Sequence, residues 1–296
     1  MKKTLSRRNV LRAGGLTTVA VLTSNCVWSH STSQVRNMQV SLAAYSVRKA
    51  LTSGKMDLFD FIDWCSELNL AGTELTSYYF KKGFDGAYLK SLRNRAFRQG
   101  VTISGTAIRN DFCQPPGAEK QQEVVQVRQW IDYAAELFAP HVRIFAGDIP
   151  NGTDKKTAIK WTADGVKQVL DHAERRGVVI GLENHGGITS EAQDLVAICE
   201  EVGDHPWFGV NLDTGNYHGR DPYGDLVLSA PKAVNVQVKV HMSGPDRTRV
   251  PADLERIRDI VVESGYKGWI VLEYEAEDPF NEIPNYVVRL KELFES

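Results

Sequence analysis

From residue 38 onward, short runs of apolar and β-branched residues alternate with longer amphipathic stretches. The short runs predict strands, and they lie at Gln39–Tyr45, Leu70–Leu75, Val101–Ala107, His141–Ala146, Val178–Glu183, Trp207–Asp213, Ala233–Val240 and Trp269–Tyr274. The amphipathic stretches predict helices, over Met56–Asn69, Tyr88–Gln99, Glu119–Phe138, Lys156–Arg176, Glu191–Glu201, Pro251–Ser264 and Asn281–Phe294. Glycines directly after three of these stretches are typical of helix ends, at Gly100, Gly177 and Gly265.

Strands that alternate with helices in this way favour βαβ units and a parallel sheet. Eight such units without a remainder predict closure into a barrel rather than an open sheet. We therefore expect an α/β fold, a single (β/α)₈ TIM barrel over residues 38–296, which is close to the roughly 250 residues that this fold needs. The first strand is not followed by a G-x-G-x-x-G motif, which argues against dinucleotide binding.

Composition excludes several classes of protein. The chain has 296 residues, of which 42% are hydrophobic, and its net charge is −2. Because no basic stripe is present, a nucleic-acid partner is not expected. The four cysteines are far apart, without a C-x-x-C spacing, and they predict isolated thiols rather than disulfides or a zinc site.

The first 30 residues predict an export signal. Arg7 and Arg8 precede a weakly apolar run over residues 13–23, which is typical of a twin-arginine (Tat) signal peptide and short linker. The run is about half of what a bilayer span requires, so no permanent membrane span is expected. The sequence therefore predicts a periplasmic or other extracytoplasmic protein. Since sugar phosphates are cytoplasmic compounds, a free sugar, a keto-sugar or an oxidised glycoside is the favoured small-molecule partner.

Three predicted strands, the fifth, sixth and eighth, run straight into a carboxylate, at Glu183, Asp213 and Glu273. In a barrel, the carboxyl ends of the strands form the active face. Acids at the mouth of apolar strands are costly unless they are satisfied, and three of them repel one another. A shared divalent cation resolves both problems. The alternative is that each acid pairs with a neighbouring Arg or Lys.

The seventh predicted strand is expected to supply a fourth metal ligand. Period-two alternation places Gln237, Lys239 and His241 on its interior face. Gln237 lies at the depth of the three acids and is the favoured oxygen ligand, whereas His241 reaches the site only if the strand starts later or bends. Four oxygen ligands favour Mn²⁺ or Mg²⁺, and a histidine ligand extends the choice to Zn²⁺, Co²⁺ or Fe²⁺.

Five segments together resemble the xylose-isomerase-like superfamily of sugar isomerases and epimerases. They are Gly72-Thr-Glu-Leu75, Leu182-Glu-Asn-His-Gly-Gly187, Leu212-Asp-Thr-Gly-Asn216, Val236-Gln-Val-Lys239 and Val271-Leu-Glu273. The resemblance implies Glu183, Asp213 and Glu273 as metal ligands. It departs from the family at Gln237, where a histidine ligand is usual, and at Asn216, where several epimerases have a histidine that binds substrate.

The resemblance also implies a chemistry, which is deprotonation next to a carbonyl with an enediolate stabilised by the metal. Glu183 and Glu273 are then the catalytic pair, one removing a proton and the other returning it. Lys239 is expected to polarise or protonate the substrate oxygen, and His185 to hold a hydroxyl or act as the acid. Further substrate contacts are expected from Glu74, Tyr45, Asn216, Arg109 and Arg247.

Other functions remain possible on the same residues. A lyase that acts on a 3-keto-glycoside by β-elimination shares the first step and the site. A metal-containing carbohydrate-binding protein shares the site without the chemistry. An endonuclease needs a histidine-rich multi-metal site and a basic face, and the sequence has neither. The oligomeric state is not predicted.

Overall fold

A closed barrel of parallel strands confirms the predicted (β/α)₈ architecture. The structure is a computed structural model, and it describes residues 38–244 and 248–295. The predicted signal segment at residues 1–30, and Arg247, lie outside the described residues. The barrel strands, in the order in which they pair, are β1 (Val40–Ala43), β10 (Ile270–Leu272), β7 (Ala233–Val238), β6 (Phe208–Asp213), β5 (Val179–Glu183), β4 (His141–Ile144), β3 (Thr102–Ala107) and β2 (Gly72–Thr76).

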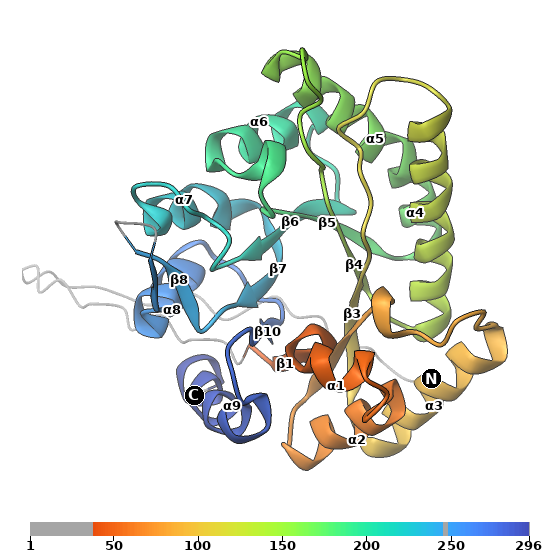
Figure 1. Ribbon diagram of the computed structural model, residues 1–296, viewed down its shortest axis with the longest axis vertical. Helices are drawn as coiled ribbons and strands as arrows, with labels where there is room; N and C mark the ends of the chain where they lie inside the picture. Colours follow the sequence, from red (N-terminus) through yellow and green to blue (C-terminus); the bar gives the residue numbers. More distant parts are fainter. Residues whose placement is uncertain (1–37, 245–247, 296) are drawn as a thin grey trace, which may run out of the picture. The chain divides into compact units, whose positions relative to one another are not determined.

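Helices surround these strands (Figure 1). They are α1 (Arg48–Thr52), α2 (Leu58–Glu67), α3 (Gly86–Gln99), α4 (Ala118–Leu137), α5 (Lys155–Arg176), α6 (Ala192–Val202), α7 (Pro222–Ser229), α8 (Leu254–Glu263) and α9 (Pro279–Phe294). Several begin directly after an aspartate whose carboxylate accepts hydrogen bonds from the first-turn N–H groups, namely Asp57, Asp85, Asp154, Asp221 and Asp253. Within the described ranges, none of the helices is long and apolar enough to cross a bilayer.

Helices α1 and α7 were not among the predicted helices. Both are short, at five and eight residues, so neither offers enough turns for a clear apolar periodicity. The start of α7 has a local signal in hindsight, because Asp221 caps it and Pro222 occupies its first position. This helix fills the crossover between β6 and β7.

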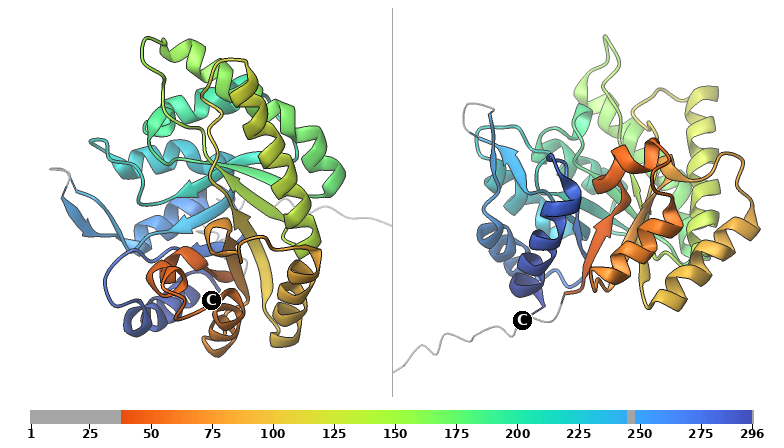
Figure 2. Two further views of the ribbon diagram at one scale, coloured as in Figure 1. Left: turned by 45° about the vertical axis from the view of Figure 1, so that its right-hand side comes forward. Right: turned by 60° about the horizontal axis from the view of Figure 1, so that its bottom comes forward.

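Strands β7 and β10 end two residues earlier than the sequence predicted, and this matters for the site. Strand β7 ends at Val238, and the chain continues into a separate antiparallel hairpin of β8 (His241–Ser243) and β9 (Arg249–Pro251). Figure 2 shows this hairpin projecting away from the barrel. Strand β10 ends at Leu272. Lys239 and Glu273 therefore lie just past strand ends, where side chains face the mouth of the barrel.

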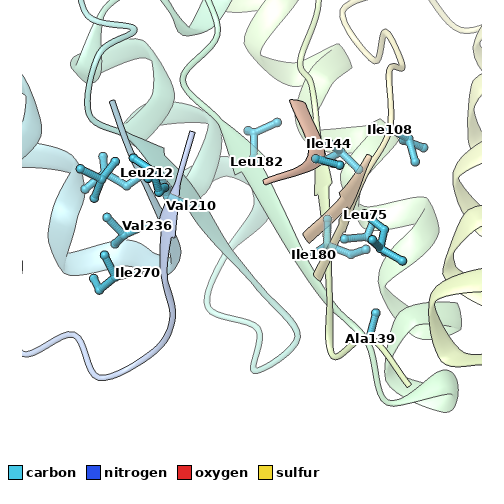
Figure 3. Close-up of a cluster of buried hydrophobic side chains, with 14 of the residues drawn as sticks. Leu75, Ile108, Ala139, Ile144, Ile180, Leu182, Val210, Leu212, Val236 and Ile270 are labelled. Carbon is cyan, nitrogen blue, oxygen red and sulfur yellow. The ribbon is translucent and has the colours of Figure 1, made fainter. Parts of the chain in front are cut away.

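Alternation along the barrel strands separates the apolar core from the interior of the barrel. Ile180, Leu182, Val210 and Leu212 belong to one buried apolar cluster between strands and helices (Figure 3). The residues that alternate with them in the sequence, Gly181, Asn211 and Asp213, face the other way because successive strand residues point to opposite faces. The apolar packing outside the barrel thus fixes which polar groups converge inside it.

Candidate active site at the carboxyl ends of the strands

A cavity of about 550 Å³ opens at the carboxyl ends of the strands. The predicted site residues that line it are Tyr45, Arg109, Glu183, His185 and Glu273. Other lining residues, not predicted as site residues, include Arg143, Phe145, Glu275 and a rim of Asn110, Asp111 and Asp148. The cavity lies on the face where barrel enzymes bind their substrates.

Glu183 is the last residue of β5, and its carboxylate is buried among cations and donors. Its Oε2 lies 2.8 Å from Arg143 Nε, and its Oε1 lies 2.8 Å from His185 Nδ1. Asn216 Nδ2 donates to Oε1 at 3.0 Å. Burial alone would raise the pKa of Glu183, but the Arg143 guanidinium and His185 hold that pKa below its ordinary value. Glu183 is therefore an ionised carboxylate held in a fixed position.

Asp213, Glu273 and Glu275 share the ammonium of Lys239. Lys239 Nζ lies 3.3 Å from Asp213 Oδ2, 3.3 Å from Glu273 Oε2 and 2.8 Å from Glu275 Oε1. Burial opposes the charge of this lysine, but the three carboxylates hold the pKa of Lys239 well above its ordinary value. Lys239 is thus a cation paired with two of the predicted metal ligands, Asp213 and Glu273, and the sequence left such ion pairing open as the alternative to a metal.

Gln237 and Glu74 form a buried polar layer beside these acids. Gln237 is the register partner of Asp213 across β6 and β7, its Nε2 donates to Glu74 Oε1 at 3.1 Å, and its Oε1 accepts from Asn211 Nδ2 at 2.6 Å. Burial raises the pKa of Glu74 to about 8. His241, the alternative ligand, lies in the β8–β9 hairpin and lines a different cavity. The structure therefore places Gln237, and not His241, beside Asp213.

The donor set is of the chemical kind that binds a divalent cation, because it consists of carboxylate and amide oxygens. Among the described residues, the buried acids of this region are Glu74, Glu183, Asp213 and Glu273, and the buried cations that pair with them are Arg143 and Lys239. Asp213 Oδ2 is buried without a hydrogen-bond partner. Such an excess of oxygen donors suits Mg²⁺ or Mn²⁺. In this conformation, however, no three His, Cys, Asp or Glu side chains of the described ranges are close enough to hold a metal ion, and the acids are engaged in ion pairs instead.

The rim residues have mixed roles. Tyr45 is half-buried and lines the cavity, whereas Arg48 stacks on the Tyr45 ring and donates to backbone carbonyls of Tyr274 and Glu275. Arg48 therefore holds the loop after β10 and does not line the cavity. Arg109 lines the cavity but is exposed.

Aromatic side chains near the barrel strands differ in whether a ligand in the cavity could reach them. Tyr78 lines the cavity and is 45% exposed, so its ring is available to a ligand. Phe80 packs in an aromatic cluster with Phe84 and Trp130. Trp207 and Trp269 stand directly before β6 and β10, at the opposite end of the strands from the cavity.

Sequence reasoning missed Arg143 and Phe145. The alternation His141-Val-Arg143-Ile-Phe145 places these three residues on one face of β4 and its extension, the same pattern that identified the interior of the seventh strand. Phe145 stacks on His185 with ring centroids 4.0 Å apart and an interplanar angle of 22°. The Arg143 guanidinium also lies over the Phe145 ring, 4.0 Å from its centroid.

Comparisons with known proteins agree with this architecture. The model of the xylose isomerase-like TIM barrel family matches residues 62–293. A search of curated proteins returns no match.

Solved structures with a similar fold cover most of the chain. A D-psicose 3-epimerase from Clostridium cellulolyticum H10 is 14% identical, with a TM-score of 0.71 over 88% of this chain and 100% of the other. A xylose isomerase domain protein from Planctomyces limnophilus is 13% identical, with a TM-score of 0.64 over 87% and 97%. A probable 3-DHS dehydratase from Bacillus anthracis is 17% identical, with a TM-score of 0.67 over 86% and 99%. Because its family model matches most of the chain and its barrel is closed, the protein belongs to the xylose isomerase-like TIM barrel family.

Proposed function

We propose that the protein is an isomerase or epimerase of a sugar, and that it removes a proton from the carbon next to a carbonyl. One observation carries this proposal. Glu183 and Glu273 line the same cavity, and two strands, β6 and β7, lie between their own strands in the barrel. The two carboxylates therefore approach a bound substrate from different sides, which is the arrangement that removal and return of a proton on opposite faces requires.

In the proposed reaction, one carboxylate accepts the proton while the C–H electron pair forms a C=C bond and the carbonyl π electrons move to oxygen. The other residue, as a carboxylic acid, returns a proton to the opposite face. The low pKa of Glu183 makes it a base that works by position rather than by strength. The Lys239 ammonium, 2.8 Å from Glu275 at the same cavity, is the second cation proposed to stabilise the developing oxyanion. His185 is proposed to hold a substrate hydroxyl.

A divalent cation is part of the proposal. Glu183, Asp213, Gln237 and Glu273 would hold it through oxygen atoms, with Mn²⁺ or Mg²⁺ favoured. When bound, it would add positive charge for the enediolate oxygens. Everything else in the reaction is assigned to the side chains of this chain.

The comparisons and the N-terminal sequence support the substrate class. Solved structures of similar fold include proteins described as D-psicose 3-epimerase and L-ribulose 3-epimerase. The twin-arginine segment at residues 7–8 supports export. We therefore propose a free ketose, or a keto-glycoside outside the cytoplasm, rather than a sugar phosphate.

A lyase is the second candidate. A probable 3-DHS dehydratase has a similar fold, so this barrel is compatible with elimination as well as epimerisation. On a 3-keto-glycoside, the same proton removal followed by departure of the glycosidic oxygen is β-elimination. The first step would use the same carboxylate.

NMR in D₂O tests the proposal. The protein is incubated with free ketoses and with 3-keto-glycosides, with added Mn²⁺ or Mg²⁺, and the substrate α-proton is followed. Deuterium incorporation without loss of the aglycone is the expected result, and loss of the aglycone identifies a lyase. Sugar binding without any exchange of the α-proton would indicate a carbohydrate-binding protein rather than an enzyme. Exchange should disappear in Glu183→Gln and Glu273→Gln but persist in Glu277→Gln, whose side chain is 93% exposed.

A further inference from the structure

The ammonium of Lys239 lies between two of the proposed metal ligands. Its Nζ bridges Asp213 Oδ2 and Glu273 Oε2 at 3.3 Å each, and both acids are proposed metal ligands. The Lys239 side chain is only 8% exposed, and the carboxylates of Asp213 and Glu273 are 0% and 8% exposed. At such burial, water screens charges weakly. An ammonium and a divalent cation on the same two carboxylates would therefore repel each other strongly.

Neighbouring residues hold the backbone and the first side-chain carbons of Lys239, and the same residue also borders a second cavity. The Lys239 backbone N–H donates to Thr214 Oγ1 at 2.9 Å. A methyl group added at Gly215 would lie 2.7 Å from Cβ and Cγ of Lys239, so the turn after β6 packs directly against the stem. Lys239 lines this second cavity, of about 310 Å³, together with Asn216, His241 and Glu275.

Glu275 is the third carboxylate partner of Lys239, and it is not one of the proposed metal ligands. It lies 2.8 Å from Nζ, closer than Asp213 or Glu273, and its side chain is 34% exposed. It lines both the main cavity and the second cavity. The ammonium can thus leave Asp213 and Glu273 and keep a carboxylate partner.

We infer that Lys239 is a built-in competitor for the divalent cation, which occupies the position between Asp213 and Glu273 and moves onto Glu275 when metal binds. The inference rests on the metal site of the proposed function. It assigns Glu275 the role of a positioning residue that stabilises the displaced ammonium. Metal affinity then depends on the difference in free energy between the two positions of the Lys239 ammonium.

Two substitutions should change metal affinity in opposite directions. In Lys239→Met, Mn²⁺ no longer competes with a cation, and we expect its Kd to fall roughly tenfold to hundredfold. In Glu275→Gln, the displaced ammonium loses its partner, and we expect the Kd to rise roughly threefold to tenfold. Binding is measured by isothermal titration calorimetry and by the EPR signal of free Mn²⁺, so that neither readout depends on catalysis.

The chain offers matched controls for both changes. Lys49 and Glu277 form an ion pair of 3.4 Å, with side chains 75% and 93% exposed. Lys49→Met and Glu277→Gln make the same chemical changes outside the site and should leave the Kd unchanged. Because Lys239→Met leaves two buried acids without their cation, circular dichroism checks its fold, and Lys239→Gln is a second variant judged by the same criterion.

The outcomes separate this inference from the proposed function. If wild type binds Mn²⁺ and removal of the Lys239 charge leaves the Kd unchanged or raises it, the inference is overturned while the metal site stands. If only the Lys239 variants bind Mn²⁺, competition is supported in its strongest form and a metal-dependent reaction of the wild type is refuted. If no variant binds, both the inference and the proposed metal site fall.

Discussion

Arg143 Nε lies 2.8 Å from Glu183 Oε2, and the two side chains are 5% and 3% exposed. They come from adjacent strands, β4 and β5, whose pairing brings Arg143 opposite Gly181. The length of Arg143 lets its guanidinium reach a carboxylate two residues further along the neighbouring strand, while the His141 ring lies over Gly181. The proposed catalytic base is therefore held by a partner that is itself part of the barrel.

Breaking this pair should be costly. We expect Arg143→Met to lower the free energy of unfolding by about 3–5 kcal/mol, because it leaves the Glu183 carboxylate buried without its cation. The double variant Arg143→Met/Glu183→Gln should be more stable than Arg143→Met alone, since the second change removes the stranded charge. Urea unfolding followed by circular dichroism measures both differences.

A surface ion pair of the same length, between Arg95 and Asp63, provides a control for this prediction. Arg95 Nη2 lies 2.8 Å from Asp63 Oδ2, with side chains 45% and 28% exposed. Arg95→Met should cost less than about 1 kcal/mol. A loss in Arg143→Met as small as that of Arg95→Met would mean that burial does not make the Arg143–Glu183 pair important.

Gly181 should not tolerate a side chain. A Cβ at this position would run into His141 Nε2 inside the barrel and lie 3.1 Å from Asn211 Cβ. We expect Gly181→Ala to lower the free energy of unfolding by about 1–3 kcal/mol through overpacking. Gly86→Ala, where an added Cβ has no atom within 4 Å, is the matched control and should be close to neutral. Equal melting temperatures for the two alanine variants would contradict the predicted clash.

The strand ends were predictable from sequence because each is an apolar run that meets a carboxylate. Strands β5 and β6 end at Glu183 and Asp213, as expected. What the pattern could not give is which charges meet across the barrel. Lys239 lies within a few residues of the predicted strand end, but its three partners come from two other strands and the loops after them. Such contacts depend on the order of strands around the barrel, which hydrophobic periodicity does not predict.

Arg143 illustrates the second limit. One charged residue in a four-residue strand is read as an edge or surface position, since charged residues are rarely fully buried without a partner. Its partner, Glu183, is forty residues further along the chain in the next strand. The local alternation around Arg143 was informative only once the neighbouring strand was known.

His141 should make stability depend on pH. Burial, aided by the Arg143 guanidinium, lowers the pKa of His141 from 6.5 to about 3, and neither ring nitrogen has a hydrogen-bond partner among the described residues. Between pH 6.5 and 3, the unfolded chain therefore binds a proton at His141 that the folded chain does not, and stability is lost as pH falls through this window. From about pH 7.5 to about pH 5, this group should cost about 2 kcal/mol.

The non-titrating variant His141→Met isolates this effect. Urea unfolding of both proteins across the same pH range gives a difference in free energy that should move by about 2 kcal/mol in favour of the variant as pH falls. Other groups titrate equally in the two proteins and cancel. A difference that stays constant from about pH 7.5 to about pH 5 would show that His141 is protonated in the folded state as readily as in the unfolded chain.

Phe145 should position His185 for the substrate without taking part in metal binding. The His185 side chain is 51% exposed, and it is held in two ways, first by the contacts of Nδ1 with Glu183 and Asn216 and second by the stacking of its ring on Phe145. Phe145→Leu removes the second contact, and we expect kcat/KM for the exchanging sugar to fall roughly threefold to tenfold, which corresponds to one aromatic contact of about 0.5–1.5 kcal/mol. The Kd for Mn²⁺ should not change, because Phe145 has no side-chain oxygen that could bind the metal. Phe145→Tyr keeps the ring and should restore the rate, and Phe97→Leu, at a position 82% exposed, should have no effect. An unchanged kcat/KM in Phe145→Leu would mean that the contacts with Glu183 and Asn216 orient the imidazole without the stacked ring.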